Sequence, residues 1–161
     1  MDTIFRQPGK TGGEIKKTER SAGFATRKNC TISLAQCNLG VMYDNGTGVE
    51  QNYAEAIKWF KKAADQGFPQ AQHNLGWMYG DGRGVEQNYD EAVRLYRLAA
   101  DQENACAQCN LGIMYIHGDC VERNYAAAYK LFKKAAEQGN ADAQFNLGVM
   151  YKQGKGVRQD Y

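Results

Sequence analysis

The chain has 161 residues and a formal net charge of +2, with 20 Lys and Arg against 18 Asp and Glu. Such a near-neutral balance argues against wholesale nucleic-acid binding, which requires a basic face. No apolar run approaches the roughly 20 residues of a membrane-spanning helix, and the N-terminus lacks the apolar core of a secretory signal. We therefore expect a cytoplasmic protein in which the five cysteines are reduced thiols.

Residues 1–34 differ in charge from the rest of the sequence. They hold seven Lys and Arg and three Asp and Glu, a net charge of +4, which leaves 13 basic and 15 acidic residues for the remainder. The segment is polar and glycine-rich, and its acidic residues fit poorly with a mitochondrial presequence, which is acid-poor. We expect residues 1–34 to be a disordered basic leader.

One phrase, Ala-Gln-x-Asn-Leu-Gly-x-Met-Tyr, recurs at a constant spacing of 36 residues. It starts at Ala35, Ala71, Ala107 and Ala143. A fixed period of this size indicates a stack of small units instead of a single globular core. The units are residues 35–70, 71–106 and 107–142, followed by a partial unit over 143–161. The sequence ends where a further helix is expected, as in a truncated array.

Each unit begins with an amphipathic helix. In the second unit the apolar residues follow a helical spacing, at Ala71, Leu75, Met78 and Tyr79. Gly76 lies beside this stripe and recurs in every unit, which predicts the close approach of a neighbouring helix. We expect Gly82 to end the helix in the left-handed conformation.

A second helix follows in each complete unit. We expect Asn88 to cap its start and Glu91, three residues later, to complete a capping box. Gly67 and Gly139 close the equivalent helices as C-terminal glycines. Because Glu103 stands at that place in the middle unit, its turn is expected to be looser or built differently.

These motifs resemble the Sel-1-like repeat family, a branch of the tetratricopeptide superfamily. The resemblance covers residues 35–161 and also uses Gly-x-Gly-Val, Asn-Tyr-x-x-Ala and Ala-Ala-Asp-Gln-Gly. It implies an all-α fold, a right-handed superhelical solenoid of 36-residue helix-turn-helix repeats, and a non-catalytic role as an adaptor or scaffold. One subgroup staples each unit with paired cysteines, but the matching places here hold Ala64 with Gln72 and Ala100 with Gln108.

In the related tetratricopeptide fold, the first helices of the units line a concave groove that binds a partner. The resemblance places this groove at fourteen residues: Cys37, Val41, Asp44, Asn45, His73, Trp77, Asp81, Cys109, Ile113, Ile116, His117, Phe145, Val149 and Lys152. Several of these lie where the four copies differ most. Identical packing requires identical residues and a ligand surface does not, although neutral drift between copies would leave the same pattern.

Trp77 stands at the centre of the predicted groove. Interface hot spots are enriched in such aromatic residues, so we expect a protein or peptide ligand that makes apolar and aromatic contacts. The alternative is a structural role, in which Trp77 packs against a neighbouring helix.

The main alternative function is that of a thiol-based redox or metal-binding protein. Cys106 and Cys109 form a C-x-x-C motif at a helix start, where a thiolate is stabilised. Cys37, His73 and Cys109 fall on one ridge, but neighbouring helices lie roughly 8–10 Å apart and zinc requires ligands at about 2.0–2.3 Å. No catalytic triad or paired-carboxylate site stands out, so we expect no enzyme activity, no cofactor and no bound metal.

Overall fold

The computed structural model describes the backbone of residues 12–156 and the side chains of residues 29–156. The described part consists of helices and contains no strand. The helices are α1 (Gly12–Asn45), α2 (Tyr53–Asp65), α3 (Pro69–Asp81), α4 (Tyr89–Asp101), α5 (Ala105–His117), α6 (Tyr125–Glu137) and α7 (Ala141–Gln153). From α2 onward every helix has 13 residues, and equivalent helices start 36 residues apart, as at Tyr53, Tyr89 and Tyr125. The 36-residue period of the sequence is therefore also the period of the structure.

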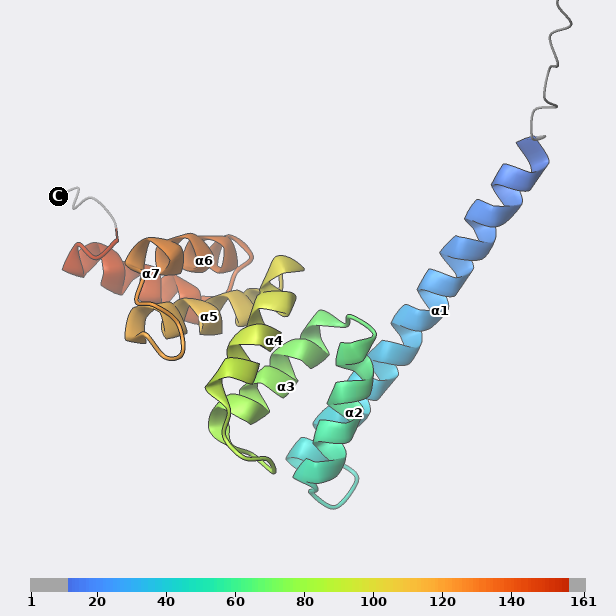
Figure 1. Ribbon diagram of the computed structural model, residues 1–161, viewed down its shortest axis with the longest axis horizontal. Coiled ribbons are helices and arrows are strands. Elements are labelled where there is room, and N and C mark those ends of the chain that lie inside the picture. Colours follow the sequence, from blue (N-terminus) through green and yellow to red (C-terminus); the bar gives the residue numbers. More distant parts are fainter. Residues whose placement is uncertain (1–11, 157–161) are drawn as a thin grey trace, which may run out of the picture.

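Each helix packs against its neighbours in the chain. Figure 1 shows the helices stepping from α1 at one end to α7 at the other, with the N-terminal part of α1 running beyond the array. This arrangement confirms the predicted all-α solenoid. Among the described residues, none of the helices combines the length and the apolar character needed to cross a membrane.

The structure differs from the expected leader at the start of the array. Residues 12–34, expected to be disordered, form the larger part of α1, while residues 1–11 lie outside the described residues. No glycine or proline interrupts residues 24–39, so the first helix of the array can continue upstream. Ser33 is buried and donates a hydrogen bond to Gln66 Oε1 at 3.0 Å. The first unit therefore begins before Ala35.

In the three complete units, the glycine of the repeated phrase faces an aromatic ring on the second helix of the same unit. A methyl group on this glycine would lie 2.6, 3.0 and 2.8 Å from an aromatic ring in the three complete units: Gly40 against Phe60, Gly76 against Tyr96, and Gly112 against Phe132. A methyl group at Gly40 or Gly112 would force the ring to shift, and at Gly76 its contact would be tighter than ordinary packing, which confirms the predicted close approach. At Gly148 on α7 no atom of the described residues lies within 4 Å of this position.

The glutamine of the phrase joins consecutive units through buried hydrogen bonds. Gln72 Nε2 donates to the carbonyl of Ala64 at 3.4 Å, and its Oε1 accepts from Gln102 at 2.9 Å. One unit later, Gln108 makes the same two contacts with Ala100 and Gln138, at 3.2 and 2.9 Å. These bonds satisfy carbonyls at the C-terminal end of the second helix that have no partner within the helix.

The second helix of each unit starts at an asparagine cap, but the predicted capping box forms only in part. Asn88 Oδ1 accepts a hydrogen bond from the Glu91 amide at 3.0 Å, as predicted. The return bond is absent because the Asn88 amide donates to the Tyr79 carbonyl at 2.9 Å. The Glu91 carboxylate pairs instead with Arg94 at 2.6 Å.

The prediction of a different turn at Glu103 is wrong. Glu103 has a φ of 62°, in the left-handed region that Gly67 and Gly139 occupy at 82° and 87°. Its amide donates to the Ala100 carbonyl at 3.0 Å, and the two glycines make the equivalent bond at 2.8 and 2.9 Å. The hydrogen bonds thus impose one turn on all three units, and Glu103 bears the strain. The prediction that Gly82 is left-handed is confirmed by its φ of 69°.

Candidate functional site

Two pockets lie between the first helices of consecutive units. The pocket between α3 and α5, here called the α3–α5 pocket, has a volume of about 200 Å³. The α5–α7 pocket has a volume of about 350 Å³. They are related by the 36-residue period, because equivalent residues line both: Trp77 and Ile113, Asp81 and His117, Tyr89 and Tyr125, Asn110 and Asn146, Ile113 and Val149, and Met114 and Met150.

Six of the fourteen predicted groove residues surround these pockets. The α3–α5 pocket is lined by Trp77, Asp81 and Ile113. The α5–α7 pocket is lined by Ile113, Ile116, His117 and Val149. Ile113 therefore belongs to both, and the two pockets form one continuous candidate surface across three first helices.

The variable position inside the phrase, at Cys37, His73 and Cys109, has a different environment from the one predicted. Cys37 and Cys109 are only 2% and 3% exposed and belong to the core. The asparagine of the following unit covers this position: Asn74 Nδ2 lies 3.9 Å from Cys37 Sγ, and Asn110 Nδ2 lies 3.2 Å from His73 Nε2. Cys37 and Cys109 therefore cannot contact a ligand in this structure.

The remaining predicted residues lie outside the two pockets. Phe145 occupies the same repeat position as Cys37 but is 71% exposed, because among the described residues no helix follows α7. Val41 and Asn45 are exposed on α1, and Lys152 is exposed on α7. Asp44 is half-buried near the end of α1.

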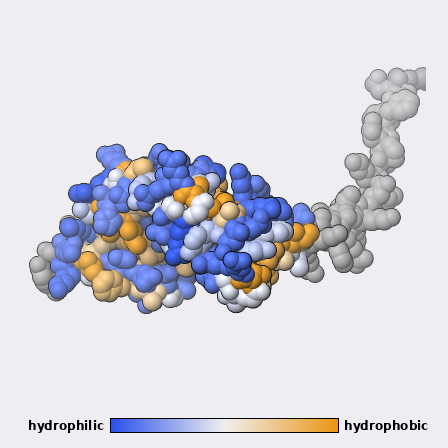
Figure 2. All heavy atoms as spheres, turned by 90° about the horizontal axis from the view of Figure 1, so that it is seen from below, coloured by the Kyte–Doolittle hydropathy of each residue, from blue (hydrophilic) through white to orange (hydrophobic). Residues whose placement is uncertain are grey.

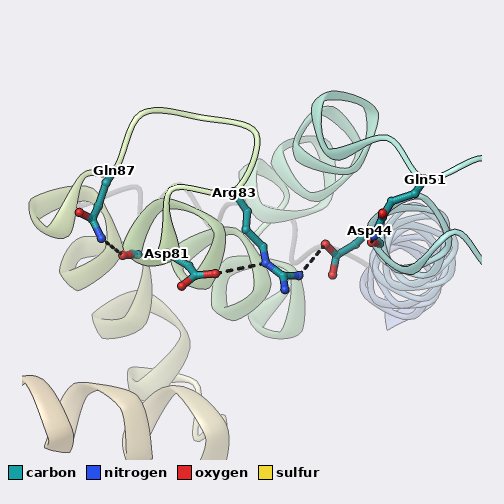
Figure 3. Close-up of polar contacts among 6 residues, drawn as sticks. Asp44, Gln51, Asp81, Arg83 and Gln87 are labelled. Carbon is teal, nitrogen blue, oxygen red and sulfur yellow. Dashed lines mark hydrogen bonds and ion pairs between the residues drawn. The ribbon is translucent and has the colours of Figure 1, made fainter.

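Arg83 extends across the equivalent junction between α1 and α3. Its guanidinium carbon lies 4.2 Å from the centroid of Trp77 and 5.5 Å from that of Tyr53. It also pairs with Asp44 at 3.5 Å and with Asp81 at 3.2 Å, and Figure 3 shows it lying between these two carboxylates. Arg83 is thus held in place by two carboxylates and makes a cation–π contact with one face of the Trp77 ring. Arg83 lies in a loop, outside the first helices at which the resemblance places the groove, so the sequence does not reveal its role.

The largely buried titratable residues near the α3–α5 pocket, Tyr96 and His73, are uncharged at pH 7. Burial raises the pKa of Tyr96 to about 12, although a hydrogen bond with Asn110 opposes this shift. Burial also lowers the pKa of His73, and its hydrogen bond with Asn74 opposes the change. Tyr96 and His73 therefore stay neutral at pH 7, and the formal charge at this pocket comes from its aspartates.

The structure gives no support to the redox alternative. Burial raises the pKa of Cys109 to about 11, which disfavours the thiolate that thiol chemistry requires. Cys106 is exposed, and both cysteines are free thiols. Within residues 29–156, no three His, Cys, Asp or Glu side chains come together as a group that could hold a metal ion.

Comparison with known proteins relates the whole array to one family. The family model of the Sel1 repeat matches four segments, residues 33–68, 69–104, 107–140 and 141–161. A comparison with curated proteins found no significant match. Among solved structures, a Sel1 repeat protein from Oxalobacter formigenes is 42% identical, with a TM-score of 0.75 over 80% of this chain and 51% of that one.

Two further solved structures are similar. The protective antigen c5321 of uropathogenic Escherichia coli, which displays an SLR fold, is 47% identical, with a TM-score of 0.75 over 79% of this chain and 27% of that one. Helicobacter pylori cysteine rich protein B is 24% identical, with a TM-score of 0.61 over 75% of this chain and 93% of that one, and supports the fold alone. This chain thus spans about half of the Oxalobacter protein and about a quarter of the antigen. Because the repeat model matches nearly all of residues 33–161, the chain belongs to the Sel1 repeat family.

Proposed function

We propose that this chain binds a peptide or a partner protein across the α3–α5 and α5–α7 pockets. Sel1 repeats are in general protein–protein interaction modules and typically serve as non-catalytic scaffolds. The observation that carries the proposal is the pair of neighbouring pockets, which lie one repeat apart and share Ile113. An extended or helical ligand places successive side chains at regular intervals, so one ligand can fill both.

The chemistry of the pockets supports a ligand with apolar and aromatic side chains. Trp77 is 36% exposed, although Arg83 covers part of its ring. Ile113 and Val149 are half-buried and line the next positions along the array. Tryptophan is enriched among the residues that dominate interface binding energies, so Trp77 is the expected anchor and Ile113 and Val149 extend its apolar surface.

The surroundings of the pockets are polar. Figure 2 shows a face of the molecule on which hydrophobic residues form separate patches among hydrophilic ones. An interface of this kind combines apolar anchors with a polar rim, which is typical of partners that associate and dissociate. The proposed role requires no cofactor.

Capture of the partner by purified protein variants tests the proposal. We expect Trp77→Ala to reduce recovery of the captured partner, with unchanged helicity by circular dichroism. The matched control is Leu98→Ala, since Leu98 is 41% exposed on α4 and lines neither pocket. Equal recovery of the partner by wild type and Trp77→Ala would show that the pockets are not the binding site. Loss of recovery with Leu98→Ala alone would place the binding site on the face that carries Leu98.

A further inference from the structure

The loop after each first helix carries a residue whose charge differs between units. This position is Thr47, Arg83, Asp119 and Lys155 along the chain. Arg83 lies over the ring of Tyr53, 5.5 Å from its centroid. Lys155 lies over the ring of Tyr125, also at 5.5 Å. At two junctions of the array, therefore, a loop cation covers the tyrosine that begins the second helix of the preceding unit.

The junction in the middle of the array lacks this cation. The equivalent tyrosine is Tyr89 and the equivalent loop residue is Asp119, and both line the α3–α5 pocket. Tyr89 is 42% exposed, whereas Tyr53 and Tyr125 are half-buried. The ring of Tyr89 is therefore exposed to solvent and lines the same pocket as the carboxylate of Asp119, whereas a cation covers the equivalent ring in the first and third units.

The acidic partner of the cation has also changed position. At the first junction, Arg83 pairs with Asp44 on α1. The residue one repeat after Asp44 is Gly80, which lines the pocket and has no carboxylate. At this junction the loop residue Asp119 lines the pocket instead, so the carboxylate comes from the loop and not from the first helix.

The charges around the α3–α5 pocket favour a positively charged group. Its only charged lining residues among those described are Asp81 and Asp119. Asp81 pairs with Arg83, whereas Asp119 makes no ion pair within the described residues. The aromatic walls are formed by Trp77 and Tyr89. Arg83 already lies over one face of the Trp77 ring, so the ring of Tyr89 is the one left to attract a further cation.

We propose that the α3–α5 pocket binds an arginine or lysine side chain of the partner, between Asp119 and the ring of Tyr89. The inference rests on the proposed function and narrows its ligand, since it requires a basic residue at one fixed place in the bound segment. The array supplies its own template, because Arg83 and Lys155 make the equivalent contact within the chain.

A small probe tests this site without the partner. Blocked arginine (N-acetyl-arginine methylamide) is titrated into the protein while the indole N–H signal of Trp77 is followed by NMR. We expect a saturable shift of this signal, and binding of neutral blocked citrulline that is at least about fivefold weaker. Trp59, the second of the two tryptophans, lines neither this pocket nor the α5–α7 pocket, so its indole signal is the internal control.

Three variants complete the test. Asp119→Asn should weaken arginine binding by about fivefold, and Asp119→Arg, which copies the arrangement of Arg83, should abolish it. Glu122→Gln removes an exposed charge from the same loop and should bind as the wild type does. Circular dichroism verifies that each variant folds.

The cation site is overturned if Trp77 shows no saturable shift, if citrulline binds as well as arginine, or if Asp119→Asn binds unchanged. None of these results involves partner capture, so the proposed function is judged separately by Trp77→Ala. Partner capture by Asp119→Arg at the wild-type level would likewise refute the cation site and leave the proposed function standing.

Discussion

His73 Nε2 lies 3.2 Å from Asn110 Nδ2, across the junction between α3 and α5. On the other side of the ring, His73 Nδ1 lies 3.0 Å from Asn74 Oδ1. An amide nitrogen only donates and an amide oxygen only accepts. The nearest partner of Nδ1 is the Asn74 oxygen, with Gln70 Nε2 farther away at 3.4 Å, so the imidazole donates at Nδ1 and accepts at Nε2. His73 is therefore neutral, and a second proton would break the bond to the following unit.

The first prediction is that acid destabilises the array through His73. Burial lowers the folded-state pKa of His73, so as the pH falls the unfolded chain takes up the proton first. The stability is complete above the unfolded pKa of about 6.5 and decreases as the pH falls below it. Urea unfolding between pH 7.5 and 5.5, roughly one unit on either side of that value, measures the loss. His73→Gln should reduce the loss and His117→Gln, at an exposed site, should not.

The second prediction is that relief of a strained turn stabilises the protein. Glu103 has a φ of 62° where the other units have glycine. We expect Glu103→Gly to raise the free energy of unfolding by about 1 kcal/mol, because glycine carries no steric penalty in this region. Gly139→Ala makes the reverse change at a position where none of the described residues has an atom within 4 Å of the added methyl group, and should cost about as much. Denaturant unfolding of both variants measures the effect, and a Glu103→Gly protein no more stable than wild type would disprove the strain.

The third prediction compares two equivalent glycines on helices. A methyl group at Gly112 would lie 2.8 Å from the ring of Phe132, whereas none of the described atoms lies within 4 Å of one at Gly148. We expect Gly112→Ala to cost about 1–3 kcal/mol through overpacking. Gly148→Ala should gain about 0.5–1 kcal/mol, because alanine favours the helix. Thermal unfolding measures the stability of both variants. Equal changes in stability would contradict the tight contact between Gly112 and Phe132.

The fourth prediction concerns the buried glutamine of the phrase. Gln108 is fully buried and bridges Ala100 and Gln138. Gln108→Leu removes both of these bonds, while the Ala100 carbonyl keeps the Glu103 amide and Gln138 Nε2 keeps the Lys134 carbonyl. We therefore expect a loss of about 0.5–1.5 kcal/mol of stability for each lost bond. Gln144, one unit later, is exposed and serves as the control, since water can replace its bond to Ala136. A loss at Gln144→Leu as large as that at Gln108→Leu would show that burial does not set the cost.

Much of the fold follows from the repeated phrase. The helical spacing of Leu75, Met78 and Tyr79 identifies the first helix, and Asn88 marks the start of the second. The role of Gly76 is also visible in advance, because a glycine that recurs in a helix interior indicates close packing. These features are local or repeat with a fixed period, so a single sequence reveals them.

The contacts between units are harder to predict. Within one helix, Cys37 and Val41 are both variable positions on an outward side, and the sequence does not show which one the next unit covers. The structure buries Cys37 under Asn74 and leaves Val41 exposed. The conformation of Glu103 is equally hard to predict, because hydrogen bonds within the turn override the preference of a non-glycine residue for negative φ.

The most direct test of the proposed binding surface is site-specific crosslinking at Ile113, which lines both pockets. A photoreactive amino acid replaces Ile113 in one variant and Leu98 in the control, and the covalent adducts with the partner are analysed by mass spectrometry. Binding across the two pockets predicts an adduct from position 113 and none from position 98. A partner that crosslinks at position 98 and not at position 113 would contradict it.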